Sequence, residues 1–355
     1  MTTSQAHLAF SLTERVGSAT LSKLMEGGKT AVEAWETYPK KVSRTGGEVD
    51  YEREEELAKR YGVRILTIDD EDYPALLRQS PSAPLVLYVK GNVKALSMKS
   101  VALVGTRRAT VYGRTQANRF AYELCKAGWA VVSGLALGID AESHRGALDA
   151  EGVTVGVIGS GLDRFYPEEN RQLAREIVMK GGAVVSQFPF GRSADQTTFP
   201  IRNHVVAALS RGVLAIEAPV KSGTLITTSI AADLGRTVMA VPGRVSDRMS
   251  SGCLNLIREG ATMVRCTDDV LEAILPESER KKCVQNEPVS DRDPESPPYS
   301  VEEALVMLHV DEDGISIDEL VQKTGLTVEK VNSLTMTLRI KGFVRFLPGN
   351  RVAIA

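Results

Sequence analysis

The chain has 355 residues, of which 43% are hydrophobic and 25% charged, as expected for a globular protein of two or three domains. The formal net charge is −2, so a nucleic-acid binder of this composition must concentrate its cations locally. The four cysteines have no metal-ligand or redox spacing, and we recognise no signal peptide, which predicts a cytoplasmic protein with reduced thiols and no cofactor. No apolar run reaches about 18 residues, so we expect no membrane span.

The first 65 residues have apolar positions at helical spacing, interrupted by Val16-Gly17-Ser18. A helix, a turn that contains glycine and a second helix are similar to a helix-hairpin-helix, in which turn amides can touch a phosphate. A small structural helical cap is the alternative. We therefore expect a helical domain over residues 1–65, followed by a connecting segment with one strand, LVLYVKG, at residues 85–91.

Short β-branched runs alternate with helical runs in the next part of the chain. We expect strands at Val101–Gly105, Ala130–Ser133, Thr154–Ile158, Ala183–Ser186, Val213–Glu217, Thr237–Val241 and Thr262–Val264. This alternation predicts an α/β domain over residues 66–276, with a doubly wound, mostly parallel sheet covered by helices on both faces. Such sheets bind ligands beyond the carboxyl ends of their strands.

Residues 277–300 are rich in Pro, Ser and mixed charge and have almost no apolar residues, which predicts a disordered linker. The last segment, residues 301–355, shows three helical runs and then FVRFLPGNRVAIA, which predicts two strands around Pro348-Gly349-Asn350. Three helices followed by a hairpin indicate a winged-helix domain.

Small or hydroxyl residues follow several of the predicted strands, and each of these turns has a cation close by. The cations are Arg107, Arg171, Arg202 and Lys221, and the small, hydroxyl or amide residues beside them include Gly105, Ser133, Gly134, Gly161, Asn203, Ser222, Gly223 and Thr224. Amides at the start of a helix are unpaired and lie at the positive end of its dipole. The convergence of these turns and their cations on one edge of the sheet predicts a phosphate site.

Each of these features also has a simpler interpretation. Glycine and serine are common in such turns for steric reasons alone, and Arg171 could be a solvated surface charge. We expect Asp140 to be the N-cap of the helix that runs through Leu148. His144 could act as a base, but a structural hydrogen bond is favoured because no nucleophile stands nearby. Glu217 is a further carboxylate near these turns.

A set of motifs from Tyr73 to Val264 resembles the DNA processing protein DprA (Smf) family. The matching segments, in family order, are YPALL with APLVLYVKG, VALVGTRRATVYG, VVSGLALGIDAESHRGAL, GVIGSGLDRFYPEEN, FPIRN, KSGTLIT, GRTVMAVPG and SGCLNLIREGA. The resemblance implies an extended Rossmann-like fold. It also implies binding of single-stranded DNA, a homodimer, and loading of the RecA recombinase onto incoming DNA in natural transformation, with no catalytic activity in this role.

Position by position, the resemblance adds roles to several residues. The arginine of the GxR element matches Arg107, the YPxxN asparagine and the cation after it match Asn170 and Arg171, and the FPxRN element matches Arg202 and Asn203. The basic residue before the SG turn matches Lys221.

The chain departs from the family pattern at three positions near these motifs. His204 stands where arginine is common, Gln187 replaces the glutamate of an SE pair, and Thr228 replaces a small residue. The change at His204 weakens the cation cluster at neutral pH, but none of the three removes a main cation.

Two other functions compete with binding of single-stranded DNA. A nucleotide phosphoribohydrolase on the same sheet would resemble a PGGxGTxxE signature, whereas APVKSGTLIT lacks both the double glycine and the glutamate. A transcription regulator would read duplex DNA with its winged helix. Residues 301–355, however, contain eight acidic and six basic residues, and phosphate neutralisation dominates duplex affinity. We therefore interpret this domain as a protein-contact or accessory module.

Overall fold

The computed structural model describes residues 1–275, apart from 15, 27, 40 and 44–46, and residues 301–354, apart from 312, 313, 341 and 348. The chain forms two compact units, Met1–Pro276 and Glu277–Ala355. The linker predicted at 277–300 lies outside the described residues. Within the described ranges, no helix combines the length and the apolar character needed to cross a membrane.

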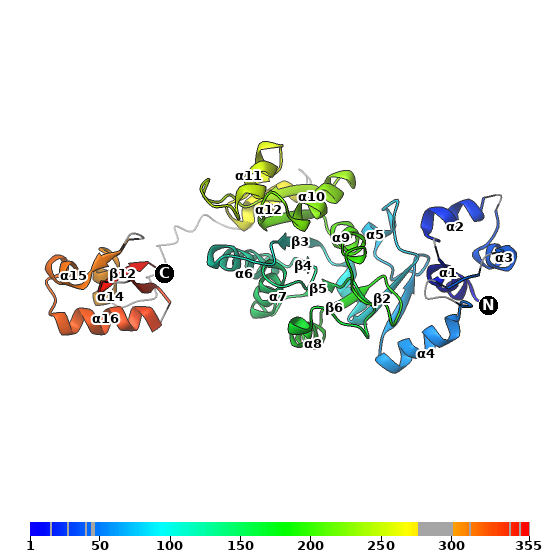
Figure 1. Ribbon diagram of the computed structural model, residues 1–355, viewed down its shortest axis with the longest axis horizontal. Helices are drawn as coiled ribbons and strands as arrows, with labels where there is room; N and C mark the ends of the chain where they lie inside the picture. The colour runs from blue at the N-terminus through cyan, green and yellow to red at the C-terminus, as the bar shows by residue number, and fades with distance from the viewer. Residues whose placement is uncertain are drawn as a thin grey trace. The chain divides into compact units, whose positions relative to one another are not determined.

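The first unit is built on a nine-stranded sheet with the order β1-β2-β6-β5-β4-β3-β7-β8-β9 (Figure 1). The strands are β1 Arg64–Thr67, β2 Val86–Gly91, β3 Ser100–Gly105, β4 Ala130–Ser133, β5 Thr154–Val157, β6 Ala183–Ser186, β7 Gly212–Glu217, β8 Thr237–Ala240 and β9 Thr262–Met263. β2 runs antiparallel to β1 and β6, and the other neighbours are parallel. The predicted doubly wound, mostly parallel sheet is confirmed.

The direction of the strand order reverses between β3 and β7. From β3 the chain adds β4, β5 and β6 on one side, whereas β7, β8 and β9 extend the sheet on the other side. Connections that leave two adjacent strands toward opposite faces open a crevice at the carboxyl ends of those strands. The topology therefore places a ligand crevice between the ends of β3 and β7.

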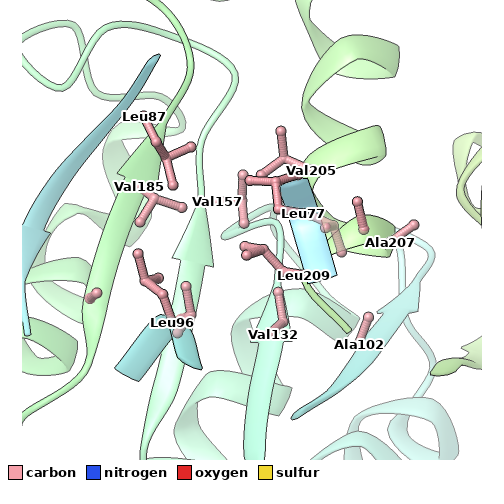
Figure 2. Packing of buried hydrophobic residues seen from close by; sticks show 14 of the residues in the cluster. Leu77, Leu87, Leu96, Ala102, Val132, Val157, Val185, Val205, Ala207 and Leu209 are labelled. Carbon is pink, nitrogen blue, oxygen red and sulfur yellow. The ribbon is translucent and has the colours of Figure 1, made fainter. Parts of the chain in front are cut away.

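Helices cover both faces of the sheet (Figure 1). They are α5 Ala75–Arg78, α6 Val111–Lys126, α7 Ile139–Asp149, α8 Arg171–Met179, α9 Thr198–Ala208, α10 Gly223–Asp233, α11 Ser251–Arg258 and α12 Thr267–Ile274, with short 3-10 turns η1 Val93–Ser97 and η2 Glu168–Asn170. Residues of β3 alternate between two cores, because successive side chains of a strand point to opposite faces. Val101 and Leu103 lie in one cluster with Phe120 of α6. Ala102 lies in the cluster on the other face, with Val205 and Ala207 of α9 (Figure 2).

The N-terminal helices α1 Thr3–Leu12, α2 Ser18–Leu24, α3 Ala31–Thr37 and α4 Tyr51–Tyr61 share a core with the sheet. Leu8 and Phe10 of α1 lie in one cluster with Tyr88 of β2 and Phe190. The expectation of helices throughout residues 1–65 is wrong at its end, since β1 begins at Arg64. This strand has four residues, of which only the last two are buried, so its sequence pattern is weak.

The carboxylate of Glu54 connects α4 to the segment after β6. Its Oε1 accepts a hydrogen bond of 2.8 Å from the Phe190 amide. Burial raises the pKa of Glu54, and the bond from the Phe190 amide opposes that rise. The Tyr61 ring stacks on the Phe190 ring with centroids 5.4 Å apart. One buried acceptor and one aromatic pair thus fasten α4 to the sheet.

The second described unit has the helices and hairpin of a winged helix. Its elements are α14 Val301–Met307, β10 Ile315–Ser316, α15 Ile317–Thr324, α16 Val328–Ile340, β11 Val344–Leu347 and β12 Arg351–Ile354. The sheet order is β10-β12-β11. The predicted winged helix is confirmed, and the sequence missed only the two-residue β10. Pro348 of the predicted turn lies outside the described residues.

We expect Glu54→Ala to destabilise the first unit by about 1–3 kcal/mol, because the buried Phe190 amide loses its acceptor. Both tryptophans of the chain, Trp35 and Trp129, lie in this unit, so tryptophan fluorescence during urea unfolding of the full chain reports on it. Glu56→Ala is the control, since Glu56 is an exposed residue of the same helix. Equal midpoints for both variants would contradict the role of Glu54.

Candidate nucleic-acid interface

A pocket of about 490 Å³ lies where the topology predicts it, at the carboxyl ends of β3 and β7. The turns after β3, β4 and β7 and the first turns of α9 and α10 form its walls. Its charged and polar lining residues are Thr106, Arg107, Arg108, Asp140, Gln196, Arg202, Asn203, Lys221, Ser222, Thr224 and Thr227. Most of the residues predicted for the site therefore meet here, although they are far apart in the sequence.

The turn after β3 presents two exposed arginines, Arg107 and Arg108. Gly105 ends the strand in contact with Ile139 of α7, where a larger residue would overlap that side chain. Thr106 fixes the turn, since its Oγ1 accepts a hydrogen bond of 3.2 Å from the Arg108 amide. The turn thus holds both cations at the mouth of the pocket.

The Arg107 guanidinium lies over the Phe199 ring, 4.8 Å from the ring centroid. A cation over an aromatic face is held by the ring quadrupole and keeps its positive charge accessible. In the described part of the chain, Arg107, Arg108 and Lys221 form no ion pair with a carboxylate. These three cations are available to an anionic ligand.

The turn after β7 leads directly into α10. Ser222 is the N-cap, and its Oγ accepts a hydrogen bond of 3.2 Å from the Thr224 amide. Lys221 and Gly223 are exposed, and Thr224 is buried. The positive end of the α10 dipole, the Lys221 ammonium and the hydroxyl groups of this turn face the same pocket. This turn therefore has the chemistry of a phosphate site.

Arg202 reaches the pocket as well, but its side chain is only 7% exposed. Its Nη1 donates hydrogen bonds to the carbonyls of Gly134 and Val157, the second at 3.1 Å. Asp140 Oδ2 lies 4.0 Å from the same nitrogen. A Cβ at Gly134 would overlap the Arg202 guanidinium, so a larger residue there would require the arginine to move. Unlike the exposed Arg107, Arg202 makes its hydrogen bonds inside the protein.

Asp140 has a different role from the one that the sequence predicts. Gly138 is the N-cap of α7, and Asp140 Oδ2 accepts hydrogen bonds from the amides of Gly134 at 3.1 Å and Ala136 at 3.4 Å. Burial raises the pKa of Asp140, and the Arg202 guanidinium opposes that rise. The carboxylate organises the turn after β4, so its N-cap assignment is wrong.

Four predicted residues do not line the pocket. Ser133 Oγ donates to the Leu103 carbonyl at 2.7 Å, and Asn170 Nδ2 donates to the carbonyls of Leu135 and Ala136 at 2.9 and 3.0 Å. Gly161 packs against the Pro189 carbonyl. Arg171 pairs with Glu168 at 2.6 Å on the surface at the start of α8. The first three shape the loops, and Arg171 lies beyond the pocket lining.

The sequence interpretation missed Arg108, Gln196 and Phe199 as lining residues. Arg108 directly follows Arg107, and Phe199 opens the FPIRN motif, so both were adjacent to a noted residue. A smaller hollow of about 30 Å³ shares Arg107, Phe199 and Arg202 with the pocket and adds Tyr166. The rings of Tyr166 and Phe199 lie 6.1 Å apart, centroid to centroid.

Two other candidate chemical groups have structural roles. Glu217 accepts hydrogen bonds from the Thr110 amide at 2.8 Å and from the Thr110 hydroxyl at 2.6 Å, which holds the start of α6. His144 is fully buried, and its Nδ1 lies 2.7 Å from Thr154 Oγ1. Among the described residues, no group of three or more His, Cys, Asp or Glu side chains could hold a metal ion.

Comparison with known proteins matches both units. The family model of DNA recombination-mediator protein A matches residues 64–275, and that of the DprA winged helix domain matches residues 290–350. Protein Smf of Synechocystis sp. is 32% identical, over 97% of this chain and 97% of that protein. The chain belongs to the DprA family. The resemblance drawn from the sequence motifs is thereby confirmed.

DprA proteins of known sequence and structure extend this comparison. The DNA processing protein DprA of Bacillus subtilis is 38% identical over 62% of this chain and 73% of that protein. The structure of DprA from Streptococcus pneumoniae matches with a TM-score of 0.63 and 32% identity, over 78% of this chain and 99% of that chain. DprA from Helicobacter pylori, whose structure describes a single-stranded DNA binding mode, matches with a TM-score of 0.54 and 29% identity, over 59% and 94% of the two chains.

We expect the buried His144 to make the stability of the first unit depend on pH. Burial, with a smaller effect of Arg202, lowers the pKa of His144 from 6.5 to about 3. Between these values the unfolded chain binds one more proton than the folded chain. The free energy of unfolding should therefore fall as the pH falls below 6.5, by up to about 1.4 kcal/mol per pH unit from this residue.

We expect His144→Asn to reduce this slope, because the asparagine amide can still donate to Thr154 Oγ1 but does not titrate. Urea unfolding of wild type and variant between about pH 4 and pH 8 measures the difference between their slopes. Parallel curves over this range would show that His144 does not control the pH dependence.

Proposed function

We propose that this chain binds single-stranded DNA through the pocket between β3 and β7, without preference for base sequence. We further propose that it loads the RecA recombinase onto DNA that enters the cell in natural transformation. Membership of the DprA family supports both proposals, and the binding mode described for the Helicobacter pylori protein supports the first. The proposed place of action is the cytoplasm, where the incoming strand and RecA meet.

The observation that carries the proposal is the set of three exposed cations without a carboxylate partner among the described residues. Arg107, Arg108 and Lys221 come from two turns that meet at one pocket, beside the N-terminus of α10. Guanidinium, ammonium and helix amides all favour a phosphate oxygen. Because phosphates carry no sequence information, binding through them depends little on the bases.

The shape of the site favours a single strand over a duplex. The cations line a hollow of about 490 Å³ between turns. Proteins that recognise duplex DNA instead insert a helix or a β-ribbon into the major groove of the DNA. Tyr166, which is 50% exposed and lies beside Phe199, offers ring surface to an unstacked base. Such stacking tolerates every base, which agrees with binding that is independent of sequence.

The other predicted residues take different places in this proposal. Asn203 lines the pocket and can donate to a phosphate. Arg202 acts from inside, by fixing the turn at Gly134. Arg171 is a flanking contact, and a phosphate would replace Glu168 as its partner. Ser133, Gly161 and Asn170 support the loops around the site.

The competing phosphoribohydrolase needs a carboxylate that reaches the ribose. Glu217, at the end of β7, accepts two hydrogen bonds from Thr110. Asp140 lines the pocket, but it accepts hydrogen bonds from two backbone amides and lies beside the buried Arg202. Both carboxylates are committed to the fold, which supports binding without catalysis. Incubation with a nucleoside 5′-monophosphate and chromatography for released base tests this point.

We also propose a homodimer formed at the β9 edge of the sheet. A hollow of about 900 Å³ lies there between α10, α11 and the last strands, and its apolar lining includes Leu225, Val238 and Leu256. Met263 in the edge strand is 47% exposed. An edge strand with exposed apolar residues needs cover, and a two-fold partner would supply it and align two DNA sites.

Arg107→Ala and Lys221→Ala should each lower the affinity for single-stranded DNA about tenfold, since each removes a charge-assisted hydrogen bond to phosphate. Fluorescence anisotropy with a labelled oligothymidylate measures this, and duplex DNA and a mononucleotide serve as competitors. The logarithm of the affinity should fall linearly with the logarithm of the salt concentration, with a slope of about −0.7 for each phosphate contacted.

Arg175→Ala is the charge-matched control for these variants, because Arg175 is exposed on α8, outside the pocket. Its affinity should equal that of the wild type. If the two pocket variants, still folded, also bound like the wild type, the pocket would not be the DNA site.

The dimer proposal predicts that Met263→Lys yields monomers, because two lysine charges would face each other at the paired edge. Light scattering of the full chain across dilution gives the mass. Met179→Lys is the matched control, since Met179 is 74% exposed on α8, away from that edge. A wild-type chain that is monomeric at micromolar concentration would end the proposal.

A further inference from the structure

The β8–α11 loop, residues 241–250, lies at the carboxyl end of β8, next to the turn that carries Lys221. None of its residues lines the pocket between β3 and β7. Because β8 is the neighbour of β7 and parallel to it, the loop extends the same edge of the sheet toward β9.

Two hydrogen bonds hold the loop and the start of α11 beside the cationic turns. The Tyr112 hydroxyl, from the first turn of α6, donates to the Pro242 carbonyl at 2.8 Å. The Gly252 amide donates to the Ala218 carbonyl at 2.7 Å, which joins the start of α11 to the segment that leads to Lys221. Within the loop, Gly243 packs against Ser250, where a Cβ would overlap the serine side chain. The loop is therefore fixed beside both cationic turns.

The side chains of this loop combine positive charge with exposed apolar surface. Arg244 and Arg248 are exposed, and Arg248 forms no ion pair with a carboxylate in the described part of the chain. The one acidic residue of the loop, Asp247, accepts a hydrogen bond of 2.8 Å from the Met249 amide. Val245 is 91% exposed, and at the start of α6 Val111 is 79% exposed.

Val245 lies between two arginines in the sequence and packs into no core. A single strand of nucleic acid could contact both kinds of side chain. Its phosphates attract cations, and its unstacked bases bury apolar and aromatic surface. Tyr112, which is 44% exposed and is bonded to the loop, adds a ring to this surface. A duplex would present only its phosphates here and would leave Val245 and Tyr112 in water.

We infer that the β8–α11 loop is a second contact for the DNA strand, which passes from the pocket over Arg248 and Arg244 toward β9. This inference rests on the proposed function of the pocket. Phosphates contact the two guanidinium groups, and bases lie against Val245 and Tyr112. The strand thereby follows one edge of the sheet across the ends of β3, β7 and β8.

The test uses the double variant Arg244→Ala/Arg248→Ala in the full chain, with labelled oligothymidylates of about 4 and about 16 nucleotides, the range of single-strand site sizes. The short oligomer should occupy only the pocket, whereas the long oligomer should extend from the pocket to the loop. We expect the double variant to bind the short oligomer like the wild type and the long oligomer about tenfold more weakly. Its salt slope on the long oligomer should be smaller by about 1.4, for two lost phosphate contacts.

Two controls separate the possible outcomes. Arg258→Ala removes an exposed arginine in the last turn of α11, and it should leave both affinities unchanged. Arg107→Ala should weaken both oligomers. If the double variant bound both oligomers like the wild type while Arg107→Ala weakened them, the loop contact would be refuted and the pocket upheld. If Arg107→Ala changed neither affinity, the proposed function itself would fail.

Discussion

Arg202 enters the sheet unit from α9 and donates hydrogen bonds to the carbonyls of Gly134 and Val157, at the ends of β4 and β5. Its buried charge is balanced by Asp140, which in turn holds the amides of Gly134 and Ala136. A buried ion pair is costly to form and still more costly to break from one side. The turn after β4 is therefore locked in one shape. The exposed cations of the site stand around this fixed turn.

The distribution of charge reconciles a net charge of −2 with the proposed binding of a polyanion. Surface arginines such as Arg64 and Arg145 pair with neighbouring carboxylates. At the pocket the nearest carboxylates are used by the fold, so Arg107 and Lys221 keep their charge for a ligand. Local arrangement, and not net composition, sets the potential that a ligand meets.

The sequence predicted the parallel sheet and the winged helix, because β-branched runs and glycine-rich turns are local signals. It also indicated cations beside four strand ends, at Arg107, Arg171, Arg202 and Lys221. It did not predict the direction of single side chains. Arg202 shares its helix face with Val205, Val206 and Leu209, a spacing of i, i+3, i+4 and i+7 that points into the core. That periodicity could have identified Arg202 as buried. The ring under Arg107 could not be predicted, because Phe199 comes from a distant helix.

The placement of Arg107 on an aromatic ring has a consequence for rates. An arginine paired with an acid must break that pair before it can take a phosphate, which adds a barrier to arrival of the strand. Arg107 has only to accept the phosphate on its open side, while Phe199 keeps its guanidinium in position. Departure is equally simple, since no competing acid has to move back into place. We expect such a contact to exchange quickly, which would suit the transfer of a strand to RecA proposed above.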